Sequence, residues 1–287
     1  MNALLIDAGN TRIKWAMVAD AAPASAPAAA DSAANAGLGA WLAFCAAHHA
    51  DLRAPGTVPG AEADPAARVA AAIAASVAAA GGAPIAHVLI ANVAGQSVLD
   101  LLTTALQAPP LSIAPEAIEW FASVPERAGV RNGYRNPYQL GCDRFAAAIA
   151  AHALCPGKPV VVANCGTATT IDATTADGTF LGGMILPGLG LMASSLAKNT
   201  AQLPQIAPGT RLPEGFADNT DDAILTGVLA AQTGAIERAF ELHNAVECII
   251  SGGAAPYVSP QVPVPHRHIE NIVLIGLQAV LNKERPC

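Results

Sequence analysis

Short apolar runs that end in polar turns alternate with longer stretches of helix-forming residues along this chain. The apolar runs predict strands at residues 3–6, 13–17, 87–92, near Ser112, and at 160–163, 179–185 and 247–251. The longer stretches predict helices at residues 41–50, 66–80, 97–106, 142–153, 189–197, 222–243 and 272–281. Strands that alternate with helices indicate an α/β fold. The order strand, turn, strand, helix, strand, helix occurs twice, so we expect two similar domains, residues 1–116 and 117–287.

Two segments differ from the rest in composition, and the first of them is too poor in large apolar residues to join a packed core. Residues 21–36 contain only Ala, Pro, Ser, Asp and Asn, and residues 55–65 are rich in Pro and Gly. We expect the first of them to be a surface loop without a chemical role.

The overall composition excludes some classes of protein. Apolar residues make up 53% of the chain, yet no apolar run approaches the roughly 20 residues needed to cross a bilayer. The opening MNALLIDAGNTRIKW lacks the cationic region and the uninterrupted apolar region of a secretory signal. We therefore expect a cytoplasmic protein without a membrane partner. A net charge of −7 argues against a duplex nucleic-acid partner, which needs clustered Lys and Arg.

The six cysteines and seven histidines form no pattern of metal ligands. The cysteines are scattered without a CxxC pair, so we expect reduced, buried thiols. His48 and His49 are neighbours on a predicted helix, where adjacent side chains point in different directions, and we assign neither a role.

The segment LLIDAGNTRIKW combines a carboxylate, a tight turn and a cation. Asp7 ends the first predicted strand and can hold Mg²⁺, because hard cations take oxygen ligands. The backbone amides of the turn and the Thr11 hydroxyl can face a phosphate, and Lys14 can offset its charge. The alternative is a plain β-hairpin in which Gly9 and Asn10 only turn the chain. Taken alone, this segment leaves both interpretations open.

A second segment, VVVANCGTATTID, repeats the pattern of a strand followed by a Gly-Thr turn, with hydroxyls at Thr167, Thr169 and Thr170. Threonines also suit ordinary strands, but two such segments favour a pair of phosphate-binding hairpins. A third segment, SGGAA at residues 251–255, follows a predicted strand, and its glycines let the backbone approach a flat or phosphorylated ligand. The GxxxxGK[ST] and GxGxxG nucleotide-binding motifs do not occur in the sequence.

A family resemblance rests on eight segments that follow one another along most of the chain. They are DAGNTRIK (7–14), NGYRNPYQLGCDR (132–144), CGTATTID (165–172), GGMILPG (182–188), KNTAQLP (198–204), NTDDAILTG (219–227), ISGGAA (250–255) and ENIVLIGL (270–277). With these segments the chain resembles the type III pantothenate kinases, members of the acetate and sugar kinase, Hsp70 and actin superfamily.

The resemblance implies two ribonuclease H-like domains of the actin-like ATPase superfamily with ATP in the cleft between them. It also implies a homodimer and the ATP-dependent phosphorylation of pantothenate to 4′-phosphopantothenate, the first step of coenzyme A biosynthesis. The implied ATP-binding residues are Asp7, Ala8, Gly9, Asn10, Thr11, Arg12, Ile13, Lys14, Thr167, Gly252 and Gly253. The implied pantothenate-binding residues are Tyr134, Gly141, Cys142, Asp143, Arg144 and Thr220, with Thr220 reaching across the dimer.

Asp143 matches the general base of the family. A primary alcohol is a poor nucleophile, and a nearby carboxylate can accept its proton as the bond to phosphorus forms. We expect Arg144 to keep Asp143 ionised through its opposite charge. The alternative is that Asp143 caps the helix that follows, and the two roles can coexist.

Asn164 is a departure from the family pattern. The family commonly has Asp at this position, two residues before the Gly of CGTATT, where it is proposed to bind K⁺ or NH₄⁺. An amide oxygen can still ligate K⁺ but brings no charge, so we expect a weaker site for the monovalent cation.

Two other functions are weighed against the kinase. Some relatives are described as accessory factors for transcription, although the acidic charge and the presence of Asp7 and Asp143 favour catalysis. Another kinase or phosphatase of the superfamily, acting on a sugar or a carboxylate, would share the fold. The YxxPxxLGxDR pattern from Tyr134 to Arg144 has no evident purpose in such an enzyme.

Overall fold

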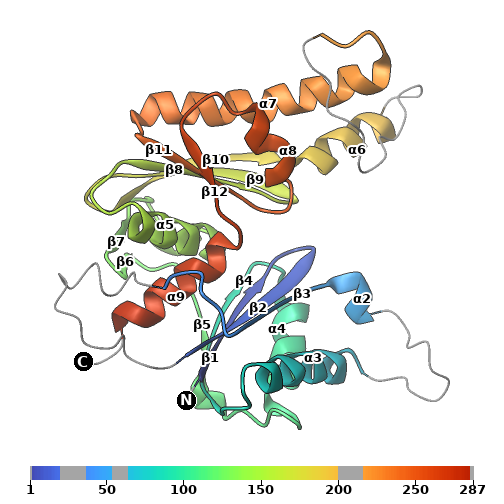
Figure 1. Cartoon of the computed structure of the whole chain (residues 1–287), viewed down its shortest axis with the longest axis vertical. Helices are drawn as coiled ribbons and strands as arrows, with labels where there is room; N and C mark the ends of the chain where they lie inside the picture. Colours follow the sequence, from blue (N-terminus) through green and yellow to red (C-terminus); the bar gives the residue numbers. More distant parts are fainter. Residues whose placement is uncertain (1, 20–36, 54–63, 200–215, 285–287) are drawn as a thin grey trace. The chain divides into compact units, whose positions relative to one another are not determined.

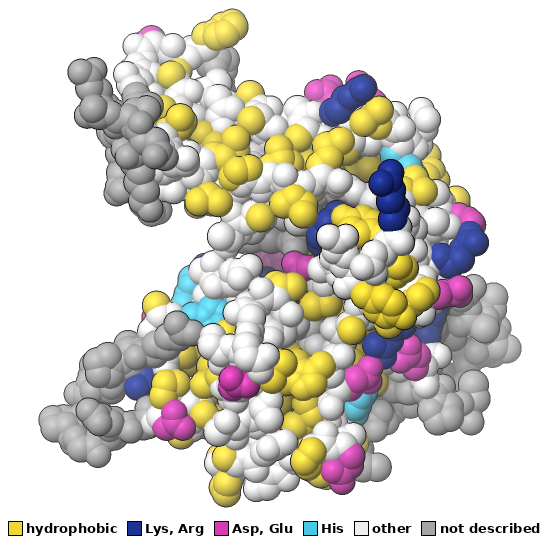
Figure 2. All heavy atoms as spheres, turned by 180° about the vertical axis from the view of Figure 1, so that it is seen from behind, with side chains coloured by type: hydrophobic (Ala, Val, Ile, Leu, Met, Phe, Trp, Pro, Cys, Tyr) yellow, Lys and Arg dark blue, Asp and Glu magenta, His cyan; other side chains and the backbone are white. Residues whose placement is uncertain are grey.

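The computed structural model describes residues 2–19, 37–53, 64–199 and 216–284. The loop expected at 21–36, most of the Pro/Gly-rich segment and KNTAQLP from residue 200 onward lie outside these ranges. Within the described ranges, no helix combines the length and the apolar character needed to cross a membrane. On the face shown in Figure 2, basic and acidic side chains are interspersed among apolar and uncharged ones.

The chain folds into two compact units, and each contains a mixed β-sheet with helices. Unit 1 consists of Met1–Ala128, Asn136–Ala150 and Val273–Cys287, and unit 2 consists of Gly129–Arg135 and Ala151–Ile272. The domain boundary expected between residues 116 and 117 divides the sequence into its two similar halves. This boundary stays a prediction.

The sheet of unit 1 has five strands in the order β3-β2-β1-β4-β5 (Figure 1). The strands are β1 (Asn2–Ala8), β2 (Arg12–Ala19), β3 (Ala43–His48), β4 (Ile85–Asn92) and β5 (Ile118–Trp120). β1 pairs antiparallel with β2 and parallel with β4. The helices between these strands are α2 (His49–Arg53), α3 (Pro65–Ala79), α4 (Gln96–Gln107) and the short 3₁₀ helix η1 (Pro115–Ala117).

Helix α3 packs on the sheet through one apolar face. It begins after Asp64, whose carboxylate accepts a backbone hydrogen bond from the first turn. Val69 and Ile73 lie one turn apart and pack with Trp15 of β2 in the core of unit 1. The Trp15 indole N–H donates a buried 2.9 Å hydrogen bond to the Ser76 hydroxyl, so the large ring is buried with its polar atom paired.

The second sheet has the strand order β12-β11-β8-β9-β10-β7-β6. Its strands are β6 (Glu126–Arg127), β7 (Val130–Asn132), β8 (Val160–Cys165), β9 (Ala168–Thr174), β10 (Thr179–Pro187), β11 (Glu247–Ser251) and β12 (His266–His268). β8 pairs antiparallel with β9 and parallel with β11, as β1 does with β2 and β4. The order β12-β11-β8-β9-β10 therefore matches β5-β4-β1-β2-β3, which confirms the expected repeat of one arrangement.

The remaining helices follow the strands of the second half. They are α5 (Cys142–Leu154), α6 (Leu189–Asn199), α7 (Thr220–His243), α8 (Ala255–Val258) and α9 (Ile272–Glu284), with 3₁₀ helices η2 (Pro137–Gln139) and η3 (Ser259–Gln261). The five cysteines in the described residues are free thiols, as expected, but Cys45 and Cys142 are only partly buried.

Helices α5 and α9 touch at a glycine. A Cβ at Gly276 of α9 would lie 1.9 Å from the Ala146 carbonyl oxygen of α5, so a larger residue does not fit without displacing a helix. The Phe145 ring of α5 also stacks on Phe121, with ring centroids 6.0 Å apart. The first turns of α5 are thereby fixed within unit 1.

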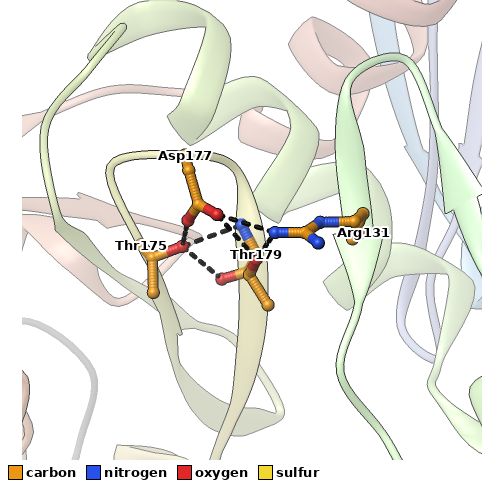
Figure 3. Close-up of polar contacts among 4 residues, drawn as sticks. All are labelled: Arg131, Thr175, Asp177 and Thr179. Atoms are coloured by element: carbon orange, nitrogen blue, oxygen red, sulfur yellow. Dashed lines mark hydrogen bonds and ion pairs between the residues drawn. The ribbon is translucent and has the colours of Figure 1, made fainter.

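A polar cluster fastens the β9–β10 hairpin to β7 (Figure 3). The Arg131 guanidinium donates hydrogen bonds to Asp177 (2.7 Å) and Thr179 (2.8 Å). Within the turn, the Thr175 hydroxyl donates to Asp177, and the Thr179 N–H donates to the Thr175 hydroxyl (2.9 Å). The bond from Thr175, followed by the charge of Arg131, holds the pKa of Asp177 below its usual value. The cluster fixes the start of β10, where Arg131 and Thr179 are paired.

The helix expected at residues 41–50 is wrong. Residues Ala43–His48 form β3, which pairs with β2, and helix α2 covers His49–Arg53. Ala43, Cys45 and Ala47 pack on the core, whereas the residues between them are exposed. The small alanines conceal this alternation in the sequence, and pairing with the edge of β2 decides the structure.

The strand expected near Ser112 is also wrong. Ser112 has a φ of 48° and its N–H donates to Ala108 O (3.0 Å), which places it in a turn. The nearby strand is β5, Ile118–Trp120. The sequence pattern does not predict β6, β7 or β12, because two or three residues are too few to show alternation.

Candidate active site

The first glycine turn joins β1 to β2 and is held by His49. Gly9 N–H donates to Arg12 O (3.0 Å), which closes the turn. The backbone N–H of His49 donates to Thr11 O (3.1 Å), and Nε2 of its ring lies 2.8 Å from Gly9 O. Because a carbonyl oxygen can only accept, Nε2 carries the proton and donates. Asn10, Thr11 and Arg12 are exposed, so the turn is rigid at its base and open at its tip.

Asp7 and Lys14 flank this turn as paired residues of β1 and β2, and both are partly buried. Burial raises the pKa of Asp7 to about 6; the charge of Lys14 lowers it and the charge of Asp143 raises it. An ionised Asp7 is therefore incompletely neutralised by its surroundings. Such a carboxylate is suited to binding a cation.

The segment GCDR lies near the same end of the sheet. Helix α5 begins at Cys142 and places Asp143 in its first turn. The Cys142 thiol donates to the backbone oxygen of Asn92, the last residue of β4 (3.5 Å). Asp143 Oδ1 accepts the following backbone N–H (2.8 Å), and a Cβ at Gly141 would lie 2.7 Å from this oxygen. Glycine at 141 thus leaves room for the carboxylate, and Asp143 is close enough to influence Asp7.

The net pKa shift of Asp143 is opposite to the one expected from Arg144 alone. Burial raises its pKa, while the backbone N–H and the positive charge of Arg144 lower it. Arg144 therefore acts in the expected direction, but burial outweighs it and the net shift is upward. The helix begins at Cys142, so Asp143 lies inside the first turn and the cap interpretation is wrong. Burial, followed by the charge of Asp143, raises the pKa of the Cys142 thiol to about 11, which keeps it protonated.

In unit 2, the second glycine turn at residues 165–167 packs against the glycines that follow β11. Gly252 has a φ of +93°, and a Cβ there would lie 2.4 Å from Cys165 O. Ala254 N–H donates to the same oxygen (2.9 Å). At Gly253, by contrast, a Cβ would meet nothing within 4 Å. Gly252 is therefore required by close contact with the turn, and Gly253 presents open backbone beside it.

Asn164 precedes this turn on β8. It is partly buried, and its paired residues are Ser251 on β11 and Thr170 on β9. Paired residues share one face of a sheet, so oxygen-bearing side chains gather on this face. Thr167 is exposed, and its carbonyl accepts the N–H of Gly188 (2.9 Å).

Tyr134 and Thr220 lie at opposite ends of β10. The Tyr134 ring packs 5.6 Å from the Phe180 ring, between centroids, and a Cβ at Gly182 would lie 3.8 Å from it. Thr220 opens α7 and lines an apolar groove of about 880 Å³ together with Pro187. Gly182 and Pro187 are separated along a strand that rises about 3.3 Å per residue. Within one chain, the structure therefore does not bring Tyr134 and Thr220 together.

The residues fit a Mg²⁺ ion that arrives with a nucleotide. Asp7 offers a hard carboxylate oxygen, and the nearby Asp143 adds negative charge. Mg²⁺ is commonly held by one or two carboxylates, with water and phosphate oxygens as its other ligands. In the described parts of the chain, no group of three or more His, Cys, Asp and Glu forms a complete protein site. Water and phosphate oxygens would supply the rest of the coordination.

His49 is the residue of this site that the sequence pattern misses. His49 lies beside the turn because residues 43–48 form β3, whereas the sequence pattern predicts a helix there. Reading residues 43–47 as an alternating strand would have placed His49 directly beside the turn between β1 and β2.

The sequence matches known proteins along nearly its whole length. The sequence profile of the type III pantothenate kinases matches residues 40–242. The chain is 48% identical over 289 aligned residues to the type III pantothenate kinase of Janthinobacterium sp. (strain Marseille), covering 99% of this chain and 98% of that one. It is 50% identical over 202 residues to the type III pantothenate kinase of Herminiimonas arsenicoxydans, covering 68% and 77%.

Solved structures show the same fold at low sequence identity. A Campylobacter jejuni protein described as a Baf family transcriptional activator has a TM-score of 0.55 and 17% identity, covering 97% of this chain and 96% of that one. A Listeria monocytogenes protein described as an N-acetylmannosamine kinase has a TM-score of 0.50 and 12% identity, covering 99% and 98%. The expected α/β fold, with two units that each contain a sheet, is confirmed. From the matching profile and the relative that aligns end to end, the chain belongs to the type III pantothenate kinase family.

Proposed function

We propose that the protein transfers the γ-phosphoryl group of ATP to pantothenate, giving 4′-phosphopantothenate and ADP at the start of coenzyme A biosynthesis. The observation that carries this proposal is the pair Asp7 and Asp143 within unit 1. One carboxylate is placed beside a glycine turn and a lysine, and the other lies in the first turn of the helix that begins in the GCDR segment. The names of the relatives supply pantothenate as the acceptor.

In this proposal ATP is bound by two groups of residues. The first turn and its flanks are Asp7, Ala8, Gly9, Asn10, Thr11, Arg12, Ile13 and Lys14, and the second group is Thr167, Gly252 and Gly253. Exposed backbone amides and the Thr11 hydroxyl meet phosphate oxygens, and Lys14 offsets their charge. The open backbone at Gly253 suits the flat adenosine group.

Asp7 would hold Mg²⁺, which counters negative charge on the transferring phosphoryl group. Asp143 accepts the proton of the pantothenate hydroxyl as its oxygen bonds to the γ-phosphorus and the bond from phosphorus to the bridging oxygen of ADP breaks. A raised pKa makes Asp143 a better proton acceptor than an ordinary aspartate.

Tyr134, Gly141, Cys142 and Arg144 complete the pantothenate site with Asp143, and Thr220 comes from the second subunit of a homodimer. The position of Thr220 at the far end of β10 from Tyr134 supports a contribution across subunits. Asn164 is the proposed site of a weakly held K⁺ or NH₄⁺ ion. A cytoplasmic location, inferred from the composition, stays a prediction.

A role as an accessory factor for transcription is not favoured, because the likeness to the Baf family protein is a likeness of fold. The deciding experiment is a coupled assay of ADP formation with Mg²⁺ and ATP, in the presence and absence of pantothenate. We expect ADP only when pantothenate is present. Equal ATP consumption without pantothenate, or stronger stimulation by N-acetylmannosamine, would overturn the assignment of the substrate.

A further inference from the structure

We propose that His49 is a positioning residue that sets the direction of the backbone amides in the first phosphate turn. This inference rests on the proposed role of that turn in binding ATP. It concerns a histidine for which the sequence suggests no role.

His49 holds two peptide units of the turn by their carbonyl groups. Its ring Nε2–H donates to Gly9 O (2.8 Å), and its backbone N–H donates to Thr11 O (3.1 Å). In a planar trans peptide, the N–H points away from the carbonyl oxygen. Fixing these oxygens on His49 therefore directs the N–H groups of Asn10 and Arg12 to the opposite side of the turn. Amides that point to one side form a concave surface for an anion.

The His49 ring contacts the turn through one of its two nitrogens, Nε2. Its other nitrogen, Nδ1, is buried and has no hydrogen-bond partner among the residues that the structure describes. His49 also follows β3 directly and begins α2, and β3 is paired with β2 up to Arg12 and His48. The pairing of β3 with β2 therefore holds His49 next to the turn that it orients.

Loss of the ring donor would release the Gly9–Asn10 peptide. A peptide free to rotate can turn its carbonyl oxygen toward the phosphates, and this oxygen repels them where the amide would attract. The effect should fall on nucleotide binding, since the pantothenate-binding segment GCDR is held by a different contact, from Cys142 to Asn92. His49 thus acts through the turn and does not itself contact substrate.

The test compares His49→Phe, which keeps a ring but has no donor, with His49→Gln, whose amide nitrogen reaches about as far as Nε2. The matched control is His48→Phe, since neighbouring residues at a strand end point in different directions. The dissociation constant of Mg²⁺-ATP is measured by calorimetry, together with the KM values for ATP and pantothenate and the thermal unfolding temperature.

We expect His49→Phe to weaken ATP binding and raise its KM on the order of tenfold, the loss of one oriented hydrogen bond, with the KM for pantothenate changed less than about twofold. His49→Gln should recover most of the affinity, and His48→Phe should match the parent. Equal behaviour of His49→Phe and His48→Phe overturns the proposal, as does a parallel loss in both KM values without recovery in His49→Gln. If His49→Phe does not fold, His49→Asn, which is too short to reach Gly9, replaces it in the same comparison.

Binding and turnover separate this inference from the proposed function. A parent protein that binds ATP but does not phosphorylate pantothenate contradicts the proposed function, while the calorimetric comparison still decides the role of His49. A parent that phosphorylates pantothenate, with ATP affinity unaffected by His49→Phe, contradicts the inference alone.

Discussion

Asp7 and Lys14 stand opposite each other in the antiparallel pair of β1 and β2, so a carboxylate and an ammonium group lie on one face of the sheet beside the first glycine turn. The charge of Lys14 lowers the pKa of Asp7, but burial has the larger effect and the pKa rises to about 6. The protein therefore holds an ionised Asp7 at a cost in stability, and a bound cation would reduce this cost.

Asp7→Asn should stabilise the protein in the absence of metal while weakening Mg²⁺-ATP binding. The raised pKa means that the folded state binds the proton more tightly than the unfolded state, so stability falls as pH rises between about 4 and 6. Above that window the full cost remains, on the order of 2 to 3 kcal/mol for a shift of this size. We expect a higher unfolding temperature for Asp7→Asn at about pH 7.5 and a much smaller gain at about pH 4.5.

Asp177→Asn is the matched control for this measurement. Asp177 is exposed and its pKa is lowered by its partners, so its replacement should give no such gain at neutral pH. An Asp7→Asn protein no more stable than the parent at about pH 7.5 without Mg²⁺ would contradict the account of Asp7.

Asp143→Asn should leave the fold and ATP binding intact and lower kcat by a factor of about 10² to 10⁴, the usual loss for a general base. The raised pKa of Asp143 also predicts that kcat falls on the acid side at a higher pH than for an ordinary aspartate, because protonation removes the acceptor. Pre-steady-state or steady-state assays with Mg²⁺ and both substrates measure kcat as a function of pH. Turnover of pantothenate near the parental rate would show that another group takes the proton.

Two inactive variants should complement each other if subunits share a site. The test mixes Asp143→Asn chains with Thr220→Val chains until their subunits exchange. In each mixed dimer, one site then combines the intact Asp143 of one chain with the intact Thr220 of the other. Equal mixing should restore about a quarter of the parental activity, because half of the dimers are mixed and each has one complete site. Exchange is verified with differently tagged chains, and no recovery after verified exchange argues for sites within single chains.

We expect Asn164 to lower the dependence on monovalent cations. A carboxylate at this position would be repelled by the ATP phosphates and would need a cation between them, whereas the neutral amide reduces both the repulsion and the hold on the cation. We expect weak activation by K⁺ or NH₄⁺ in the parent and stronger activation in Asn164→Asp, measured as ADP formation in potassium and sodium buffers of equal ionic strength. Strong K⁺ activation of the parent that is unchanged in Asn164→Asp would mean that other oxygens form the site.

Gly252 and Gly253 are adjacent, but only Gly252 is packed too closely to accept a side chain. Gly252→Ala adds a Cβ at a φ of +93° and 2.4 Å from Cys165 O, and should cost on the order of 2 kcal/mol or more in the free energy of unfolding. Gly253→Ala meets no atom within 4 Å and should change it by less than about 0.5 kcal/mol. Denaturant titration of both variants checks this, and equal stabilities would contradict the close packing of the two segments.

The local pattern of the sequence is enough for much of this fold, because β1, β4, β8 and β11 are buried apolar runs that end in recognisable turns. It fails at β3, where alanines conceal the alternation and edge pairing decides the outcome. It also fails for His49, whose proposed role depends on that pairing, and for the direction of the pKa shift of Asp143, where burial outweighs the adjacent arginine. The strand β3, the contacts of His49 and the pKa of Asp143 all depend on distant segments of the chain. Neighbouring residues in the sequence do not reveal such contacts.

The discontinuous make-up of unit 1 sets an order for folding during synthesis. Gly276, Leu274 and Leu277 of α9 belong to unit 1, and the two leucines are fully buried. Translation proceeds from the N-terminus at roughly 5 to 20 residues per second, and domains generally fold as they emerge. Here every segment of unit 2 has left the ribosome before α9 has, so the unit that is begun first is completed second. The part of unit 1 that α9 contacts, at Gly39 and Ala146, is therefore incomplete until residues 273–284 have been made.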